Sequence, residues 1–255
     1  ILAASFCPTD GHADPHATVS AALGAAMHLG AKLRPGVGVE SLKVAGNKVV
    51  EVVTNEGRLA AGAVIIAAGV ETAALVRPLG AKLPLTIPIV TVVRTAPLPP
   101  CLNPVIGVAN ADLAVRQEVN GRLRLTSGAE PFQNSLEEVN GRPVARPSAV
   151  SLRQTLERVE AILPVLREAE IDAVWGGLLD LTPDALPVID HIKGLENAVV
   201  AAGFSGHGFG IGPITGALAA DLCLNRTPQM DISAFTFARF NSASTAEPAA
   251  LTLHG

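Results

Sequence analysis

The chain has 255 residues, of which 49% are hydrophobic, and its formal net charge is −4. This length suits one large domain or two small ones with a substantial core, and the mildly acidic balance argues against nucleic acid or an acidic membrane face as the main partner. The longest apolar run, AVIIAAGV, is far shorter than the roughly 20 residues that a membrane helix needs.

The first third of the sequence alternates helical and strand patterns. Apolar residues at close to a 3.6-residue period predict a helix over residues 16–29. Two strand patterns then flank Gly46-Asn47, and a turn at residues 55–57 completes a small antiparallel meander. The continuous apolar run at residues 63–69 is typical of a strand in a sheet that is covered on both faces.

The middle of the chain, from Pro84 to about Val144, is rich in Pro and β-branched residues and predicts an inserted antiparallel sheet. Its strongest signal is Asn120-Gly121 between two alternating patterns, which predicts a hairpin. An amphipathic helix is expected over residues 151–168. Two strands and a last helix are then expected at residues 172–181, 197–203 and 213–224.

The stretch GFSGHGFGIGP (203–213) holds five glycines between a predicted strand and a predicted helix. Glycine in regular structure lowers stability by roughly 1 kcal/mol per residue relative to alanine. Five glycines so close together therefore need a reason. The N–H groups and the partial positive charge at a helix start favour an anionic group, and glycines let a flat ligand lie on the backbone. The alternative is a glycine-rich structural turn.

This stretch, followed by a helix, resembles the C-terminal flavin-binding signature of the D-amino acid oxidase and sarcosine oxidase family of FAD-dependent amine oxidoreductases. Three other stretches agree with the family in the same order: DGHADP (10–15), KVVEVVTNEGRLAAGAVIIAAG (48–69) and WGGLLDLTPDALPVI (175–189). The resemblance covers nearly the whole chain.

The resemblance implies an α/β (α+β) fold: a Rossmann-like FAD-binding domain with an inserted antiparallel-sheet substrate domain. The expected boundaries are 1–83 for a partial FAD-binding domain, 84–189 for the substrate-binding domain, and 190–255 for the return to the FAD-binding domain and a C-terminal tail. The family begins with a βαβ unit that carries GxGxxG, and no such motif occurs here. The chain is therefore expected to be N-terminally truncated and, as a fragment alone, inactive.

The resemblance also implies the residues that contact the cofactor. FAD is expected to be bound non-covalently, because Gly177 stands where monomeric sarcosine oxidases carry the Cys that is linked to the flavin. The expected cofactor contacts are Val39, Ala67, Ala68, Gly69, Gly177, Gly203, Gly206, His207, Gly208, Phe209, Gly210 and Ile211. His207 is the catalytic candidate, orienting the substrate or holding a proton, and the alternative is a packed residue with one hydrogen bond.

In such enzymes a hydride leaves the carbon next to an amine and passes to the flavin, giving an imine that water hydrolyses. Leu179 stands where glycine and D-amino acid oxidases usually carry an Arg that grips the substrate carboxylate. Arg94, Arg116 and Arg124 are the other arginines available for this role, and for each the alternative is a solvated strand face.

The WGGLLDLTPD form is closer to subunits of multimeric sarcosine-type oxidases, opine oxidases and hydrogen cyanide synthase. The resemblance therefore favours a sarcosine, opine, proline or D-amino acid type of substrate and further subunits as partners. The alternatives are a non-catalytic, partner-binding relative and a FAD oxidoreductase of another branch, such as a glycerol-3-phosphate dehydrogenase.

Several other chemically capable residues are expected to be structural. Trp175 is the only Trp and is expected to pack in a core, and Asp180 and Asp184 are expected to cap loops through Asx-type turns. The cysteines form no CxxC pair and the histidines near position 12 lack partners, so no metal site is indicated. A reducing compartment fits this cysteine usage, so the protein is expected in the cytoplasm or at the periphery of the inner membrane.

Overall fold

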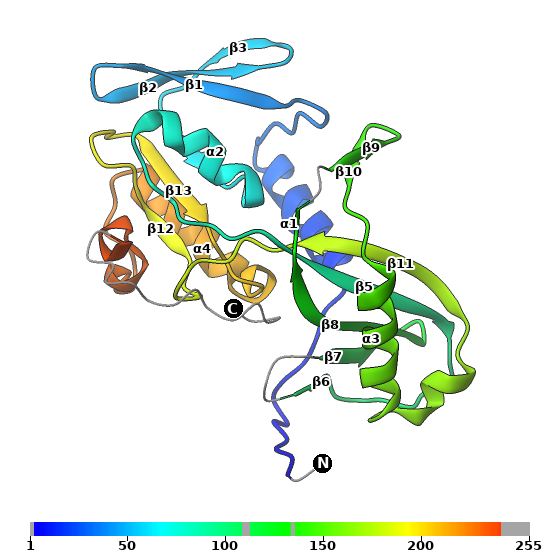
Figure 1. The fold of residues 1–255 in the computed structure, drawn as a ribbon. Helices are drawn as coiled ribbons and strands as arrows, with labels where there is room; N and C mark the ends of the chain where they lie inside the picture. The colour runs from blue at the N-terminus through cyan, green and yellow to red at the C-terminus, as the bar shows by residue number, and fades with distance from the viewer. Residues whose placement is uncertain (1–2, 109–112, 134–135, 241–255) are drawn as a thin grey trace. The chain divides into compact units, whose positions relative to one another are not determined.

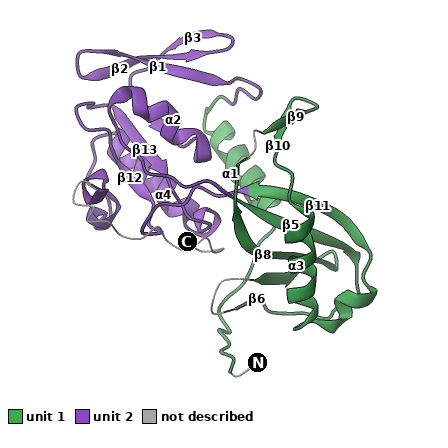
Figure 2. Cartoon of the chain, in the orientation of Figure 1, with its two compact units in different colours: residues 1–32, 89–177 green, residues 33–88, 178–255 purple. Residues whose placement is uncertain are grey.

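The computed structural model describes residues 3–108, 113–133 and 136–240 (Figure 1). The chain divides into two compact units (Figure 2). Unit 1 consists of residues 1–32 and 89–177, and unit 2 of residues 33–88 and 178–255. The mixture of helices and sheets confirms the expected fold class, whereas the division into functional domains at 83/84 and 189/190 stays a prediction.

Unit 2 contains a small mixed sheet and an antiparallel meander. Its strands are β1 (Val39–Ala45), β2 (Lys48–Thr54), β3 (Gly57–Ala60), β4 (Val64–Ile66), β12 (Val188–His191) and β13 (Ala198–Ala202). Its helices are α2 (Thr72–Val76), α4 (Gly208–Cys223) and the short 3-10 turns η1 (Gly69–Glu71), η2 (Arg77–Leu79), η4 (Ser233–Phe235) and η5 (Phe237–Phe240).

The meander in unit 2 follows the prediction from its turn residues. β1 and β2 pair antiparallel from Val39 opposite Thr54 to Ala45 opposite Lys48. Gly46, in the turn between them, has φ +62°, a conformation that glycine adopts without steric cost. β3 then pairs antiparallel with β2, as the turn at residues 55–57 predicts.

The mixed sheet in unit 2 has the strand order β12-β13-β4. β13 is antiparallel to β12 and parallel to β4, and all five of its residues are buried. β4 is shorter than the predicted run and Ile65 is 43% exposed, so among the described residues β13, not β4, is the strand covered on both faces. β4 is an edge strand of this described sheet.

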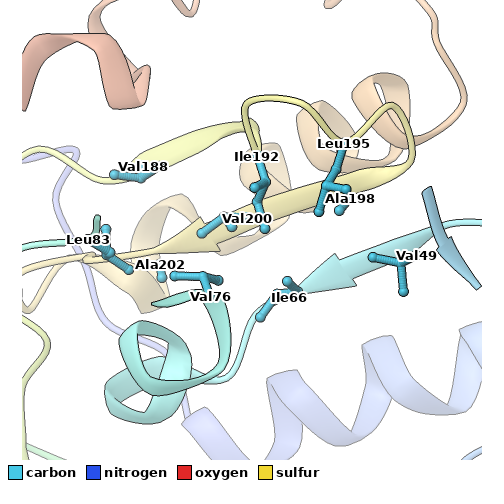
Figure 3. Close-up of a cluster of buried hydrophobic side chains, with 10 residues drawn as sticks. All are labelled: Val49, Ile66, Val76, Leu83, Val188, Ile192, Leu195, Ala198, Val200 and Ala202. Carbon is cyan, nitrogen blue, oxygen red and sulfur yellow. The ribbon is translucent and has the colours of Figure 1, made fainter. Parts of the chain in front are cut away.

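The core of unit 2 lies on both sides of β13. One side meets a cluster that includes Ile66, Val76, Leu83, Val188 and Val200 (Figure 3). The other side, through the two alternate residues of β13, packs against Ala219 of α4 and its neighbours. Because successive side chains of a strand point to opposite faces, β13 contributes to both clusters.

Unit 1 contains a five-stranded sheet of order β11-β5-β8-β7-β6. These strands are β5 (Pro88–Pro97), β6 (Ile106–Gly107), β7 (Ala114–Gln117), β8 (Arg122–Pro131) and β11 (Ile171–Leu178). The unit also holds the hairpin β9 (Glu137–Val139) and β10 (Arg142–Val144), the helices α1 (Pro15–His28) and α3 (Ala149–Glu160), and the turn η3 (Pro164–Glu168).

The sheet confirms the antiparallel character predicted for the middle of the chain. β7 and β8 pair antiparallel across Asn120-Gly121, and Gly121 has φ +83°. α3 packs on one face of the sheet through Val159, which joins Leu123 and Leu125 in a buried cluster. The predicted helix over 151–168 is shorter than expected, since α3 ends at Glu160 and a separate 3-10 turn follows.

α1 forms where the sequence predicts it, shifted by one residue. Asp14 caps its start, because the carboxylate accepts a hydrogen bond of 2.7 Å from the backbone N–H of Ala17, and Pro15 occupies the first turn. None of its residues is buried among the described part of the chain.

The side chain of Asn197 connects the meander to the region before β13. It accepts a hydrogen bond from the N–H of Val49 and donates to the carbonyls of Val49 and Gly62, each at 2.8 Å. Asn197 is only 8% exposed and Val49 1%. A buried backbone group that loses its partner costs free energy, so this side chain stabilises unit 2 by more than its size suggests.

We expect Asn197→Ala to lower the free energy of unfolding by about 2–4 kcal/mol, because it leaves both polar groups of Val49 without partners. Urea denaturation measures the change. Asn55→Ala is the matched control, since Asn55 is exposed and makes one bond, to the N–H of Gly38, so its loss should cost about 1 kcal/mol or less. Equal losses for the two variants would contradict the role given to Asn197.

Candidate functional site

The glycine-rich stretch forms a sharp turn between β13 and α4. Gly203, Ser205 and Gly206 have φ values of +73°, +50° and +85°. α4 then begins at Gly208, so the prediction that the helix begins near Pro213 was wrong. Pro213 lies inside the helix. Because proline has no N–H, one carbonyl of the preceding turn lacks its helical hydrogen bond, but the helix continues.

Four of the five glycines of this stretch fall into two classes. A Cβ on Gly203 would lie 2.5 Å from Cγ2 of Thr182, and one on Gly208 would lie 3.1 Å from Cβ of Phe204. A Cβ on Gly210 or Gly212 would meet nothing within 4 Å. Glycine in a helix costs about 1 kcal/mol relative to alanine, so packing within the chain accounts for the first class and not for the second.

A polar network from the loop after β11 holds the turn in place. The N–H of Gly203 donates to Oδ2 of Asp180 at 2.8 Å, and the N–H of Ser205 donates to the carbonyl oxygen of Asp180 at 3.2 Å. The N–H of Thr182 donates in turn to Oγ of Ser205, which is fully buried. The positive φ values of the turn are therefore supported by hydrogen bonds to one short segment.

The predicted cofactor segment Ala67–Gly69 lies beside this turn in the sheet order. β4 and β13 are parallel, with Ile66 opposite Val200, so the segments that follow them leave the sheet at the same edge. Gly69 has φ +52°, and a Cβ added there would meet nothing within 4 Å. The structure thus brings two of the predicted segments to the carboxyl ends of neighbouring parallel strands.

The N-terminus of α4 is open. No side chain among the described residues caps it, its first turn has no acidic residue, and its 16 residues give the helix a full dipole. His207 is the N-cap residue: its N–H donates to the carbonyl of Phe204 at 2.8 Å, and its own carbonyl accepts from Gly210 at 3.1 Å. Such an end favours a negatively charged or strongly dipolar group.

Two predicted cofactor residues, Val39 and Gly177, make no contact with the glycine-rich turn or with Ala67–Gly69 that the structure shows. Val39 is the first residue of β1 and is 46% exposed. Gly177 belongs to β11 in unit 1, with Val90 as the nearest neighbour of an added Cβ. The roles of both residues stay predictions, as does the role of His207.

A second candidate region lies in unit 1, on the face of the sheet opposite α3. Successive residues of β8 point to opposite faces, so Leu123 and Leu125 pack with α3 while Arg124 lies on the other face. Arg116 of β7 stands opposite Arg124 in the register. A cavity of about 210 Å³ lies here, and Trp175 lines it with its ring 5.4 Å from the guanidinium of Arg124. The prediction that Trp175 packs in a core is therefore only partly met.

The three arginines considered as carboxylate clamps differ in their partners. Arg94 Nη2 lies 2.6 Å from Oδ2 of Asp172, and Arg124 Nη2 lies 2.6 Å from Oε1 of Glu118. The hydrogen bond from Arg94 holds the pKa of Asp172 below its usual value. Arg116 has no ion pair with any residue that the structure describes.

The acidic residues of the loop after β11 both accept backbone hydrogen bonds, Asp184 through the predicted Asx-type turn and Asp180 through a different contact. Asp184 accepts a hydrogen bond from the N–H of Leu186 and pairs with Arg239 at 2.7 Å. Burial raises the pKa of Asp184, but the hydrogen bonds from Arg239 and Leu186 outweigh it, so the pKa lies below its usual value. Asp180 instead accepts a hydrogen bond from the N–H of Gly203, 23 residues further along the chain. The local sequence pattern did not predict this contact.

Clusters of metal ligands and membrane-spanning helices are both missing from the described ranges. No three His, Cys, Asp or Glu side chains there are grouped as metal ligands would be. None of the helices in those ranges has the length and apolar character to span a bilayer.

The family model for FAD dependent oxidoreductases (DAO) matches residues 1–222. The chain belongs to this family. It is 32% identical over 248 residues to 4-methylaminobutanoate oxidase (formaldehyde-forming) of Paenarthrobacter nicotinovorans, covering 94% of this chain and 30% of that protein. It is 28% identical to the D-amino acid dehydrogenase of Sinorhizobium medicae, covering 94% of this chain and 55% of that protein.

Solved structures of the same kind share the fold. The chain superimposes on L-proline dehydrogenase from P. horikoshii with a TM-score of 0.81 and 28% identity, covering 92% of this chain and 62% of that one. Glycine oxidase from Geobacillus kaustophilus gives 0.75 and 27%, covering 87% and 57%. The resemblance to this family is thereby confirmed, and the family's cofactor is FAD. The chain spans less than two thirds of the length of these relatives.

We expect Gly203→Ala to destabilise unit 2 more than Gly194→Ala, although both glycines have similar φ values of +73° and +85°. Gly194 has open space around it, so its substitution adds only the backbone cost of about 1–2 kcal/mol. Gly203→Ala adds the clash with Thr182, roughly 1–3 kcal/mol more.

Urea denaturation of the two variants, with Gly203→Ala/Thr182→Ser as a third, checks this assignment. The double variant removes Cγ2 of Thr182 and keeps its hydroxyl. It should therefore regain the stability lost to the clash, but not the stability lost to the backbone conformation. Identical losses at Gly194 and Gly203 would show that the close approach of Thr182 does not constrain the turn.

Proposed function

We propose that this chain forms part of a FAD-dependent enzyme that oxidises the C–N bond of an amino acid or secondary amine. The observation that carries the proposal is the uncapped start of α4, where an added Cβ on Gly210 or Gly212 would meet no neighbour among the described residues. It stands at the carboxyl edge of the parallel strands β4 and β13, in a chain that belongs to the FAD dependent oxidoreductase family.

The residues at that edge fit a flat, negatively charged cofactor. We assign the backbone of Ala67–Gly69 and of residues 206–211 to FAD contacts, with the Gly203 turn as their support. Bound FAD would supply the acceptor for the hydride that leaves the carbon next to the amine. The chain's own part is to stabilise negative charge with the N–H groups and dipole of α4 and to hold the turn through Asp180.

The cofactor is proposed to be non-covalent. No Cys lies in the glycine-rich stretch, and Gly177 stands where the resemblance to monomeric sarcosine oxidases would place the Cys that is linked to the flavin. Denaturation in acid followed by removal of the protein should leave all the flavin in solution.

The names of similar proteins support the substrate class. They refer to 4-methylaminobutanoate, D-amino acids, dimethylglycine and L-proline. All are amino or alkylamino acids, so we place the substrate of this protein in that class. Further subunits, suggested by the WGGLLDLTPD form, are part of the same proposal.

Anaerobic mixing of the protein from its complete gene with sarcosine, proline, an opine or D-alanine tests the reaction. At least one of these should bleach the visible absorption of the flavin, because reduction removes the chromophore of the oxidised form. Bleaching by glycerol 3-phosphate alone would indicate another branch of flavoenzymes. A purified protein that holds no flavin would indicate a non-catalytic relative.

Gly210→Val should lower FAD retention in the same protein at least about tenfold, because its side chain enters the space that packing leaves open. Gly216→Val is the matched control: it is in the same helix, also exposed and also free of neighbours within 4 Å, but it lies well beyond the first turn. Flavin content after gel filtration measures both. Gly208 is unsuitable for this test because its Cβ would press on Phe204 and disturb the turn itself.

His207→Asn separates a catalytic role of His207 from a structural one. Asn is a good N-cap residue, so α4 should begin normally. If the imidazole transfers a proton or orients the substrate, kcat should fall at least about a hundredfold while the flavin content stays normal. An unchanged kcat with normal flavin content would restrict His207 to its backbone role at the helix start.

A further inference from the structure

One arginine of unit 2 ties residues 233–240 to the loop after β11. Nε of Arg239 donates to Oδ2 of Asp184 at 2.7 Å, and Nη2 donates to Oδ1 of Asp184 at 3.3 Å and to the carbonyl oxygen of Leu186 at 2.6 Å. Nη1 donates to the carbonyl oxygen of Thr236 at 3.1 Å. The side chain of Arg239 is only 15% exposed. Such a bidentate guanidinium, which also binds backbone oxygens, fixes geometry better than an exposed ion pair does.

Residues 233–240 have a second attachment, to β12. The N–H of Phe237 donates to Oδ2 of Asp190 at 2.9 Å, and Oδ1 of Asp190 accepts from the N–H of His191 at 2.8 Å. Phe237 and Phe240 also pack against the buried cluster of unit 2 (Figure 3). Because these contacts do not involve Arg239, loss of its guanidinium should release the loop after β11 and leave residues 233–240 in place.

The carbonyl oxygen of Leu186 connects Arg239 to the glycine-rich turn. It accepts a hydrogen bond from Nη2 of Arg239 and another, of 2.8 Å, from Oγ1 of Thr182. Thr182 is buried, its N–H donates to Oγ of Ser205 at 3.2 Å, and its Cγ2 leaves no room for a Cβ on Gly203. Arg239 and the turn are therefore the two ends of one chain of contacts that runs through Leu186 and Thr182.

The loop between these contacts contains a strained residue. Ala185 has φ +59°, a conformation with a steric cost for any residue other than glycine. Asp184 and Leu186, which flank Ala185, are the two residues of the loop that Arg239 binds. A strained conformation persists only where its surroundings hold it, so without Arg239 the loop should relax and the carbonyl of Leu186 should move away from Thr182.

We propose that Arg239 is a positioning residue for the cofactor: it holds the loop after β11 so that Thr182 supports the Gly203 turn in the conformation that retains FAD. The coupling between Arg239 and the turn rests on the contacts within unit 2. Its consequence for FAD rests on the proposed function. The family model matches residues 1–222 and does not reach Arg239, so membership of the family alone gives this residue no role.

Hydrogen–deuterium exchange of the protein from its complete gene, resolved by residue, tests the coupling. Arg239→Gln should speed the exchange of the amides of Thr182 and Ser205 at least about tenfold, because the hydrogen bonds that protect them open more often. The amides within β13 should exchange as in the unchanged protein. Equal acceleration in β13 would indicate a general loss of stability and would overturn the proposal.

Two further variants complete this experiment. Asp184→Asn keeps an oxygen for the N–H of Leu186 and removes the charge that Arg239 binds, so it should speed the same exchange at least about threefold. It decides the question if Arg239→Gln does not fold, and unchanged exchange in it would refute the coupling. Arg34→Gln is the control, since it removes an exposed ion pair of 2.9 Å with Glu56 in the same unit and should leave the turn unaffected.

A double-mutant cycle tests the path from Arg239 to the cofactor. Arg239→Gln should raise the dissociation rate of FAD at least about fivefold. Thr182→Val keeps the shape of the side chain and removes the hydroxyl that donates to Leu186, so in its background Arg239→Gln should add little. Asn197→Ala, which weakens unit 2 elsewhere, should leave the rate unchanged. Additive effects at Arg239 and Thr182, or equally fast release from Asn197→Ala, would refute this path.

The outcomes distinguish this inference from the proposed function. Faster exchange at Thr182 and Ser205 in Arg239→Gln, in a protein that never holds flavin, would support the coupling and refute the proposed function with its cofactor. Unchanged exchange at both amides, in a protein whose flavin is bleached by an amino acid, would support the reaction and refute the role of Arg239.

Discussion

The parallel pairing of β13 with β4 is the constraint on which unit 2 depends. Three register pairs, from Ala198 opposite Val64 to Val200 opposite Ile66, align strands that lie more than a hundred residues apart in the sequence. β13 is buried on both faces, so a slip of one residue would exchange the side chains between two different clusters. Because the two strands run parallel, the glycine turn and Ala67–Gly69 leave the sheet at the same edge.

That edge requires unusual backbone conformations, and the loop after β11 stabilises them. Ser205 is a non-glycine residue at φ +50°, a conformation with a steric cost. Its hydroxyl and N–H, together with the N–H of Gly203, are bound by Asp180 and Thr182. The WGGLLDLTPD segment therefore has a physical role that does not depend on any ligand: it fixes the path of the chain into α4.

The sequence predicts what depends on local geometry and misses what depends on distant partners. The hairpin at Asn120-Gly121 and the turn at Gly46 follow from the backbone freedom of glycine, and both are confirmed. The start of α4 at Gly208 is missed, since a proline at the first helical position is the usual signal and Pro213 lies further in. Arg94 and Arg116 have the same strand pattern, and only the position of Asp172, 78 residues from Arg94, decides which of them is paired.

Each unit contains a local cost that the described chain does not offset. In unit 2 it is glycine inside the first turns of a helix with an uncapped N-terminus; in unit 1 it is two opposed arginines with unused donors. A sequence selected for stability alone would replace Gly210 with alanine and Arg116 with a neutral residue. Local rules that a sequence breaks without compensation mark functional positions. Negative charge would offset both costs, at the uncapped start of α4 in one unit and beside the two opposed arginines in the other.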